Sequence, residues 1–262
     1  MNDLVKFNHL SKYKEVSHCY TTKKGGVSSG VFTSLNMGFK RGDDPKCVME
    51  NYRLVCSELG IDIKSLVLSN QVHKDTIKYV TKSDIGKGIF KESDILEVDG
   101  LMTDVKGVGL VTFYADCVPI LFYDPLNQAI AASHAGWRGT VLKIGPKTVG
   151  EMVKKFNTKP EDLLIGIGPS IGGCCYEVSE DVKKEFDLSF NDDIIAKVVK
   201  PVGDKYHIDL WEANRQALIE CGVDPLNIET SELCTKCHQE RFFSHRVMGT
   251  DRGSQVAIMA LN

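Results

Sequence analysis

The sequence predicts an α/β protein built around a mixed β-sheet, and two observations point to that class. Amphipathic helical segments are interspersed with short apolar runs of the kind that form strands. Several of these runs are separated by tight turns rather than by helices, which indicates antiparallel neighbours and argues against a pure βαβ repeat. The chain has 262 residues and contains no internal repeat, low-complexity tract or linker. We therefore expect a single domain over residues 1–262.

The clearest helix is expected over residues 43–60, where both start and stop signals are present. Asp43 or Asp44 can cap the N-terminus, and Pro45 suits the first turn. Gly60 can end the helix because glycine readily adopts the left-handed conformation. Further helices are expected over 140–156, 210–221 and, as a shorter segment, 179–186. Strands are expected over 66–70, 76–81, 108–114, 118–124, 128–134, 163–167 and 255–261.

Two of these strands flank the turn sequence Asp-Pro-Leu-Asn and are expected to form a hairpin, because Asp, Pro and Asn favour turns. With the centre of the turn between Pro125 and Leu126, Cys117 and His134 lie opposite each other at the open end. Directly paired residues have Cβ atoms about 4.5–5.5 Å apart, which is close enough to share one metal ion or one proton. Taken singly, a cysteine is more often part of a core, and a histidine beside a turn is more often a surface residue. Their coincidence at a strand end favours a functional pair.

A third candidate, His73, lies in a polar break between two predicted strands. His73, Cys117 and His134 together form what we call the His₂Cys set. Thiolate and imidazole ligands suit zinc or copper, and three protein ligands leave a fourth position open for water or substrate. Without a metal, Cys117 beside a histidine would be an activated thiol, as in a cysteine hydrolase or amidase. A copper-handling protein would use the same ligands without turnover.

Composition argues against several other classes of protein. The net charge of −3 gives no long-range attraction to nucleic acid or to an anionic membrane. No segment approaches the roughly 18 uninterrupted apolar residues of a membrane span, and residues 1–20 contain no apolar signal region. The nine cysteines show no framework spacing, so we expect reduced thiols in the cytoplasm. The sequence predicts no particular oligomeric state.

Two further motifs are less informative. Residues 234–238 match the Cys-x-x-Cys-His pattern of covalent haem, but that chemistry requires export, for which the sequence shows no signal. Cys234 and Cys237 are then interpreted as a redox pair, an adventitious zinc site or a pair without a chemical role. The glycine-rich segment 166–175 lacks the Gly-Lys-Ser/Thr of a P-loop. We expect a tight turn there, with an anion-binding nest as the alternative.

Six short motifs, in order along the chain, resemble those of a known family: NQVH, DGLMTD, ADCVPILFYDP, SHAGWRGT, IGPSIGGCCYEV and CTKCHQERFFSHR. From about residue 34 to its end, the chain resembles the bacterial multicopper polyphenol oxidoreductases, or laccase-domain proteins. Members are described as purine nucleoside phosphorylases with adenosine deaminase side activity, and some as peptidoglycan editing factors. The resemblance implies a layered α/β/β/α fold similar to a group of cysteine hydrolases. It also implies that the His₂Cys set holds a metal, with zinc expected first and copper as the alternative.

The histidine count argues against a true multicopper oxidase. Such enzymes combine a trinuclear copper cluster, usually bound through His-x-His pairs, with a separate His₂Cys copper site. This chain has seven histidines and no His-x-His pair, so it cannot build the cluster alone. Copper bound at the single His₂Cys set would support only an incidental polyphenol oxidase activity.

The resemblance implies that phosphate displaces the base of adenosine, inosine or methylthioadenosine, giving the free base and a ribose 1-phosphate-type sugar. Arginine supplies a forked pair of donors for phosphate, so we expect Arg41, Arg138 and Arg246 to contribute to substrate binding. We expect Gln71, two residues before His73, to contribute as well. Adenosine deamination would use a metal to lower the pKa of water toward about 7. The expected partners are therefore a small purine nucleoside and phosphate.

Overall fold

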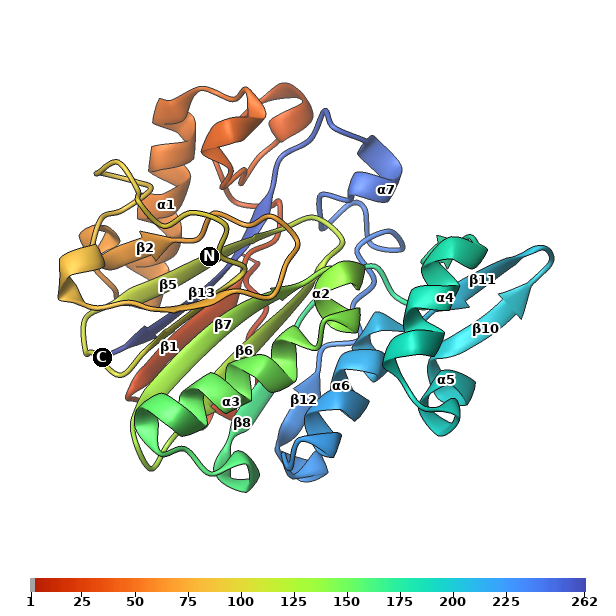
Figure 1. The fold of residues 1–262 in the computed structure, drawn as a ribbon. Helices are drawn as coiled ribbons and strands as arrows, with labels where there is room; N and C mark the ends of the chain where they lie inside the picture. Colours follow the sequence, from red (N-terminus) through yellow and green to blue (C-terminus); the bar gives the residue numbers. More distant parts are fainter. Residues whose placement is uncertain (1–2) are drawn as a thin grey trace.

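The computed structural model describes residues 3–262 and contains two β-sheets packed face to face, with helices on both outer faces (Figure 1). The predicted α/β class, with mixed sheets in a layered order, is confirmed. Alternation along strand β6 (Val118–Asp124) shows how the layers form. Ile120 and Phe122 pack with the covering helices, whereas Leu121 and Tyr123 pack between the sheets. Strands buried on both faces are continuous apolar runs, as observed here.

The larger sheet has six strands in the order β12-β8-β6-β7-β4-β3. The bounds of the other five strands are β12 Ile228–Thr230, β8 Leu164–Ile167, β7 Ala129–Ala135, β4 Gly100–Thr103 and β3 Ile77–Tyr79. The four central strands pair antiparallel, whereas each edge strand pairs in parallel with its neighbour. Helices α3 (Ile144–Phe156) and α6 (Leu210–Glu220) cover the outer face of this sheet (Figure 1).

The smaller sheet has four strands in the order β1-β13-β5-β2. Their bounds are β1 Val16–Tyr20, β13 Gln255–Leu261, β5 Gly109–Tyr114 and β2 Leu66–Leu68. Helix α1 (Pro45–Leu59) covers its outer face, where Tyr52 and Val55 pack in one cluster with Val111 of β5 (Figure 1). The last strand of the chain is therefore central to this sheet, which binds the C-terminal end into the core.

The start and stop signals of α1 act as the sequence predicts. The side chain of Asp44 caps the helix by accepting a hydrogen bond from the backbone N–H of Lys46 at 2.9 Å. Pro45 occupies the first helical position, and Gly60 ends the helix with a left-handed φ of 69°.

The single helix expected over 140–156 is wrong in one respect, because the structure has two helices there. Helix α2 (Trp137–Val141) ends before Lys143, which has a left-handed φ of 60°, and α3 begins at Ile144. The Lys143 ammonium lies 3.1 Å from the centre of the Phe190 ring. This cation–π contact joins the break to a distant part of the chain, which local helix signals do not reveal.

A third, three-stranded sheet with the order β10-β11-β9 forms part of a lobe that projects from the main body (Figure 1). Its elements are β9 Glu177–Val178, α4 Glu180–Ser189, α5 Asp192–Val198, β10 Val199–Val202 and β11 Lys205–Ile208. The sequence predicts only α4 among them. A short helix α7 (His245–Met248) and seven three-residue 3₁₀ helices complete the described elements. The 3₁₀ helices are Leu10–Lys12, Gly30–Phe32, Phe39–Arg41, Ile63–Ser65, Lys82–Asp84, Pro160–Asp162 and Pro225–Asn227.

The hairpin formed by β6 and β7 is present, but its register differs from the expected one. His134 pairs with Pro119 rather than with Cys117, because the turn is centred one residue later than the sequence suggests. Moving a pairing by two residues keeps each side chain on the same face of the sheet, since side chains alternate with a period of two. Cys117 and His134 are therefore diagonal neighbours rather than a direct pair.

Within residues 3–262, no helix combines the length and the apolar character that crossing a membrane requires.

Candidate active site and metal centre

The structure brings the three residues of the His₂Cys set together. His73 lies in the loop after β2, Cys117 immediately precedes β6, and His134 is the penultimate residue of β7. Their candidate ligand atoms all lie within 4.8 Å of one another. Two imidazoles and one thiol thus converge from three separate segments, at the end of the hairpin that the sequence predicts.

A buried carboxylate, Asp99, orients both histidines of this set. It accepts hydrogen bonds from the backbone N–H groups of Val72, His73 and Lys74, each at 3.0 Å. These bonds support the left-handed φ of 61° at His73. Asp99 also accepts the Nδ1–H of His134 at 2.8 Å. The Nε2 of His134 is therefore the nitrogen that is left for the thiol or for a metal, as in carboxylate–histidine–metal arrangements.

The electrostatics of the site favour a thiolate. Burial would raise the pKa of Cys117, but the charge and hydrogen bond of His134, together with His73, lower that pKa to about 6. Burial would lower the pKa of His134, but Cys117 and Asp99 raise it to about 9. Burial also opposes ionisation of Asp99, whose pKa is nonetheless held below its usual value by His134 and the backbone N–H groups. A deprotonated thiol is the form that binds a metal or attacks a substrate.

The residues that flank Cys117 and His134 leave room for this cluster. Asp116 has a left-handed φ of 84°, which turns the chain into Cys117. A Cβ at Gly136 would lie 3.0 Å from the Sγ of Cys117 and 3.2 Å from a ring carbon of His73. Only a residue without a side chain fits there without a shift, which accounts for the first glycine of the Ala-Gly-Trp-Arg-Gly turn.

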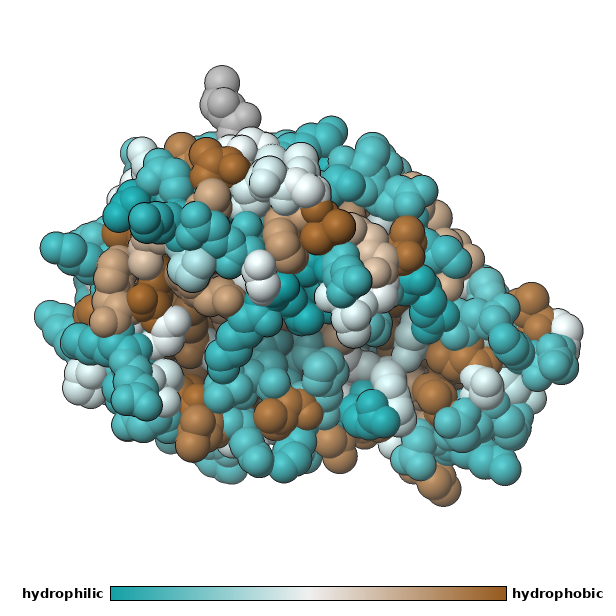
Figure 2. Space-filling view, turned by 90° about the horizontal axis from the view of Figure 1, so that it is seen from above, coloured by the Kyte–Doolittle hydropathy of each residue, from teal (hydrophilic) through white to brown (hydrophobic). Residues whose placement is uncertain are grey.

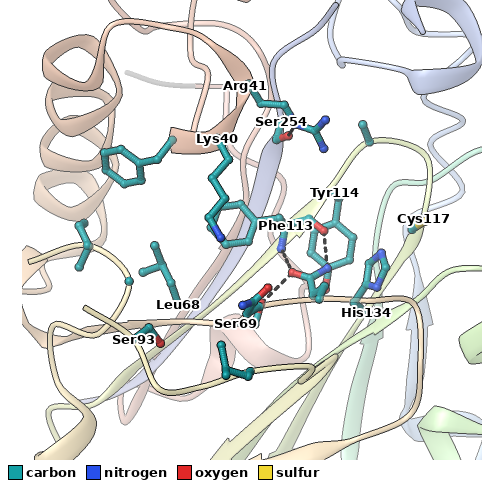
Figure 3. Close-up of a pocket in the computed structure, with 18 of the residues that line it drawn as sticks. Lys40, Arg41, Leu68, Ser69, Ser93, Phe113, Tyr114, Cys117, His134 and Ser254 are labelled. Atoms are coloured by element: carbon teal, nitrogen blue, oxygen red, sulfur yellow. Dashed lines mark hydrogen bonds between the residues drawn. The ribbon is translucent and has the colours of Figure 1, made fainter. Parts of the chain in front are cut away.

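The His₂Cys set opens into a cavity of about 870 Å³. Figure 3 shows His134 and Cys117 at one end of this cavity, with Lys40, Arg41 and Ser254 at the other. The rest of the lining combines apolar side chains with polar ones. The apolar part, here called the apolar wall, is formed by Phe39, Leu68, Ile89, Phe90, Leu96, Phe113 and Tyr114, and the polar part by Ser69, Asn70, Gln71, Lys91, Glu92 and Ser93. The face seen from above is mostly hydrophilic and is hollowed near its middle (Figure 2). The cavity thus combines a basic end, an apolar wall and an end that carries the His₂Cys set.

Two arginines define the basic end of the cavity. The Nε of Arg41 donates to the hydroxyl of Ser254 at 3.1 Å. Arg252 is 6% exposed, and burial followed by the charge of Arg41 lowers its pKa to about 10. The Nε of Arg252 is buried and has no hydrogen-bond partner within residues 3–262, and no carboxylate there forms an ion pair with either guanidinium. Two neighbouring guanidiniums without an ion-pair partner among residues 3–262 are suited to bind an anion.

The four expected substrate-binding residues are placed differently. Arg41 and Gln71 line the cavity. The amide of Gln71 is occupied by the backbone of Phe113, accepting from its N–H at 2.6 Å and donating to its carbonyl at 2.8 Å. Gln71 thus holds the backbone of Phe113 in place. Contact between Gln71 and a substrate stays a prediction.

Arg138 and Arg246 do not belong to the cavity lining. The guanidinium of Arg138 lies 4.2 Å from the centre of the Trp137 ring. Arg246 donates to the carbonyl oxygen of Glu177 at 2.9 Å and lies 5.3 Å from the centre of the Tyr176 ring. Burial, followed by the charge of Cys117, raises the pKa of Tyr176, and the charges of both arginines oppose that rise. Their part in substrate binding remains a prediction.

Sequence reasoning missed two residues of this site, Asp99 and Arg252. Asp99 is the first residue of the DGLMTD motif, so a motif residue without an assigned role was the available signal. Arg252 lies three residues before the strand β13 and has no comparable signal. Its importance depends on burial and on its distance to Arg41, which only the folded chain defines.

Comparisons with known proteins agree with this site. The family model of the multi-copper polyphenol oxidoreductase laccases matches residues 17–262. The chain is 36% identical to a purine nucleoside phosphorylase of Bacteroides thetaiotaomicron, over 95% of this chain and 93% of that protein. It is 34% identical to adenosine deaminase RL5 of an unknown prokaryotic organism, over 93% and 94% of the two chains.

A solved structure extends the agreement to the fold. The crystal structure of the protein YfiH from Bacillus licheniformis superposes with a TM-score of 0.94 at 33% identity, covering 100% of this chain and 97% of the other. The order of the motifs, the layered fold and the match to the family model all indicate the same family. The chain belongs to the multi-copper polyphenol oxidoreductase laccase family.

Proposed function

We propose that this protein is a purine nucleoside phosphorylase. The observation that carries the proposal is one cavity that is lined both by two neighbouring arginines, Arg41 and Arg252, and by the His₂Cys set. Phosphorolysis forms a bond between a phosphate oxygen and C1′ of the ribose and breaks the bond from C1′ to the purine. The bonding electron pair leaves with the base, which takes up a proton. The names of the relatives support a purine as the leaving group.

Arg41 and Arg252 are proposed to bind and orient the phosphate. A guanidinium donates two parallel hydrogen bonds to a phosphate, and a buried one does so with less competition from water. Lys40 and the hydroxyl of Ser254 lie at the same end of the cavity and add donors (Figure 3). The apolar wall, including Phe39 and Phe113, offers contact surface for the flat purine ring. Adenosine, inosine and methylthioadenosine are the proposed substrates.

The His₂Cys set is proposed to hold one metal ion, with zinc as the first candidate and copper as the second. The donor atoms fit such an ion, because they converge within 4.8 Å and Asp99 leaves the Nε2 of His134 free. When bound, the ion supplies Lewis-acid polarisation at the position that the protein leaves open. Adenosine deamination is proposed as a side activity of the same centre, in line with the name of the deaminase relative.

Residues 1–262 are proposed to form one domain that acts on small molecules in the cytoplasm, without nucleic acid or membrane partners. Two features support this proposal. Strand β6 contributes to the hydrophobic clusters on both faces of the larger sheet, and β5 does so in the smaller sheet, so the core is continuous across the layers. The nine cysteines are free thiols, as a reducing compartment favours.

The test is to incubate protein of defined metal content with adenosine and phosphate and to identify every product by mass spectrometry. We expect adenine and ribose 1-phosphate in equal amounts, with adenine release dependent on phosphate. Inosine formed without phosphate would report the deaminase side activity. Adenosine returned unchanged, with or without zinc, would contradict the proposal.

A cysteine hydrolase or amidase is the second candidate, and a specific geometry favours it. Cys117, His134 and Asp99 form a continuous thiol–imidazole–carboxylate chain, which is also the arrangement of a cysteine nucleophile with its base. The proposed similarity of the fold to cysteine hydrolases would suit this chemistry and an editing role in peptidoglycan. The two imidazoles that converge on one sulfur favour the metal-binding alternative, because a nucleophile needs only one base.

Mass spectrometry of protein quenched during turnover separates these two candidates. A ligand role for Cys117 predicts no substrate-derived adduct and a loss of activity after treatment with a chelator. Full activity in metal-free protein would contradict the ligand role of Cys117, and a substrate-derived adduct on Cys117 would favour the hydrolase.

A further inference from the structure

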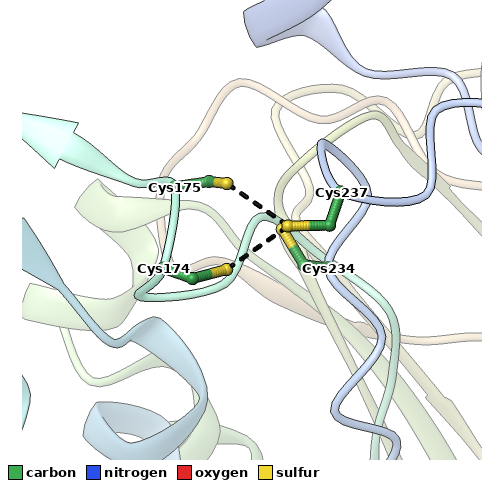
Figure 4. A group of neighbouring side chains, drawn as sticks. All are labelled: Cys174, Cys175, Cys234 and Cys237. Atoms are coloured by element: carbon green, nitrogen blue, oxygen red, sulfur yellow. Dashed lines mark hydrogen bonds between the residues drawn. The ribbon is translucent and has the colours of Figure 1, made fainter.

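A second group of thiols lies outside the cavity and takes no part in the function proposed above. Its members, here called the four-cysteine cluster, are Cys174, Cys175, Cys234 and Cys237. The first two lie in the loop before β9, and the last two lie in the turn that follows β12 (Figure 4). All four sulfur atoms lie within 4.8 Å of one another. The sequence interpretation treated Cys234 and Cys237 as an isolated pair, which the structure corrects.

The spacing of the sulfur atoms suits one tetrahedral metal ion. The Sγ of Cys237 lies 3.6 Å from that of Cys174 and 3.5 Å from that of Cys175. Four thiolates bound tetrahedrally at about 2.3 Å from zinc have sulfur–sulfur separations of about 3.8 Å. Figure 4 shows the four side chains pointing toward a common centre from two loops.

Disulfide bonds describe this geometry less well. A disulfide requires a sulfur–sulfur distance of about 2.05 Å and Cα atoms roughly 4.4–6.8 Å apart. The Cα atoms of adjacent residues such as Cys174 and Cys175 are about 3.8 Å apart, which is below that range. All nine cysteines of the chain are free thiols in the structure.

The backbone holds the two cysteine-bearing loops in register without any metal. The N–H of Ser170 donates to the carbonyl of Leu233 at 3.3 Å, and the N–H of Thr235 donates back to Ser170 at 2.9 Å. The N–H of Gly172 donates to the Sγ of Cys234 at 3.3 Å. A hydrogen bond of this kind favours the thiolate, and such bonds commonly orient the sulfur ligands of metal sites. The site is therefore prearranged by the fold.

We propose that the four-cysteine cluster binds one zinc ion as a closed structural site, separate from the His₂Cys set. Four thiolates satisfy zinc completely and leave no open position for substrate, which distinguishes this site from the one in the cavity. None of the four cysteines belongs to the cavity lining. Zinc binding by this cluster does not depend on whether the protein acts on purines.

The position of the cluster suggests what the ion stabilises. Thr235, between the last two cysteines, donates its hydroxyl to a carboxylate oxygen of Asp116 at 2.5 Å. Ile171, near the first two, donates its N–H to the carbonyl of Asp116 at 2.9 Å. Asp116 directly precedes Cys117. A zinc ion that joins the two loops would therefore also hold the segment that presents Cys117 to the cavity.

The experiment counts zinc in protein purified under reducing conditions without added chelator. The wild-type chain should hold about two equivalents, one at each thiolate-containing site. Cys234→Ser with Cys237→Ser should lose one equivalent, and Cys117→Ala should lose the other. A matched control, Cys47→Ser with Cys221→Ser, removes two thiols from outside both sites and should keep both equivalents.

X-ray absorption at the zinc edge of the Cys117→Ala protein decides the ligand set, even if the double cysteine variant fails to fold. We expect four sulfur neighbours at about 2.3 Å and no imidazole signature. A spectrum dominated by nitrogen or oxygen neighbours would overturn the proposal. So would the absence of zinc from this variant after incubation with zinc and dialysis, or disulfide-linked peptides from the four cysteines in freshly reduced protein.

Discussion

The two convergent ligand sets of this protein differ in what surrounds them. The His₂Cys set opens into the cavity, and a fully buried carboxylate, Asp99, orients its histidines. The four-cysteine cluster lies between two surface loops, with two of its cysteines exposed and no carboxylate among its members. Both sets bring soft ligands within 4.8 Å, so ligand type alone does not separate them. What separates them is the surrounding structure.

This difference shows how cysteine can serve either a catalytic site or a structural site, depending on its surroundings. In the cavity, three candidate ligands would leave one position open on a bound metal, and His134 and His73 lower the pKa of Cys117 against the effect of burial. In the cluster, four thiols would complete the coordination of a bound zinc ion, and the neighbouring hydrogen bonds come from backbone groups. A three-ligand site beside two arginines is suited to catalysis, because a metal bound there keeps a position free for substrate. A four-thiol site between two loops is suited to stabilising the fold.

The largest effect is expected for Cys117→Ala. Removing the thiolate should abolish phosphorolysis and release the metal of the cavity, because two histidines alone bind zinc weakly. The fold should persist, since the side chain is only partly buried and lies just before the strand β6. The phosphorolysis rate, zinc content and circular dichroism of the variant check this expectation. Cys221→Ser is the matched control, and equal activity in both variants would remove Cys117 from the active site.

Arg252→Ala and Arg41→Ala should each raise the apparent KM for phosphate. Losing one charge-assisted contact costs about 1.5–3 kcal/mol, which corresponds to roughly a 10- to 150-fold increase. Arg252→Lys keeps the charge but loses the forked donors, so we expect an intermediate value. Initial rates at varied phosphate concentration and saturating nucleoside provide the measurement.

Two further variants place these values in context. Arg215→Ala changes an arginine of helix α6 outside the cavity and should leave the KM for phosphate unchanged. Arg138→Ala tests the sequence-based prediction directly, and we expect a smaller effect than that of Arg252→Ala because Arg138 packs over Trp137. An effect as large as that of Arg252→Ala would place Arg138 at the phosphate.

Asp99→Asn should weaken zinc binding at the His₂Cys set by about 10- to 100-fold, the usual cost of losing a carboxylate that orients a histidine ligand. The amide keeps the shape but offers one oxygen to four donors: the three backbone N–H groups and His134. Competition with a chromophoric chelator measures the change. Zinc in the four-cysteine cluster should stay unaffected, and equal weakening of both sites would argue against their independence.

The smallest effect concerns His18, a buried histidine outside both sets that contrasts with His134. Its Nε2 accepts the backbone N–H of Phe7 at 2.9 Å, so the fold requires the neutral ring. Burial, followed by the charges of Lys6 and His9, lowers its pKa to about 4 against the opposing charge of Glu229. In the unfolded chain the pKa of His18 is near its ordinary value of 6.5. Between about pH 6.5 and 4, His18 is therefore protonated in the unfolded chain but neutral in the folded one.

The sign of the resulting pH dependence follows from this difference in proton binding. The free energy of unfolding should fall as the pH falls through that window, by up to about 1.4 kcal/mol per pH unit. Urea unfolding of the wild type and of His18→Asn at several pH values checks this contribution. The variant should show a shallower slope, and identical slopes would show that His18 does not titrate on unfolding.

Local signals were sufficient for much of the fold. Asp44, Pro45 and Gly60 define α1 because capping and φ preferences depend on neighbouring residues. The Asp-Pro-Leu-Asn turn predicts the hairpin of β6 and β7 for the same reason, and the period of two preserved the relation of Cys117 to His134 despite the shifted register. The lobe containing β10 and β11 has weaker local patterns, and its strands were not predicted.

The sequence by itself determined the layered α/β class, the hairpin and the convergence of the His₂Cys set, because these depend on turns, alternation and recognisable motifs. Only the tertiary structure decided which other residues join the site. Arg138 is four residues from His134 but helix α2 turns it over Trp137, whereas Arg252 reaches Arg41 from more than two hundred residues away. The four-cysteine cluster likewise joins residues 62 and 63 positions apart. The number of residues between two positions predicts their separation in space only within one helix, strand or hairpin. Contacts between residues far apart in the sequence, such as these, depend on how separate elements pack.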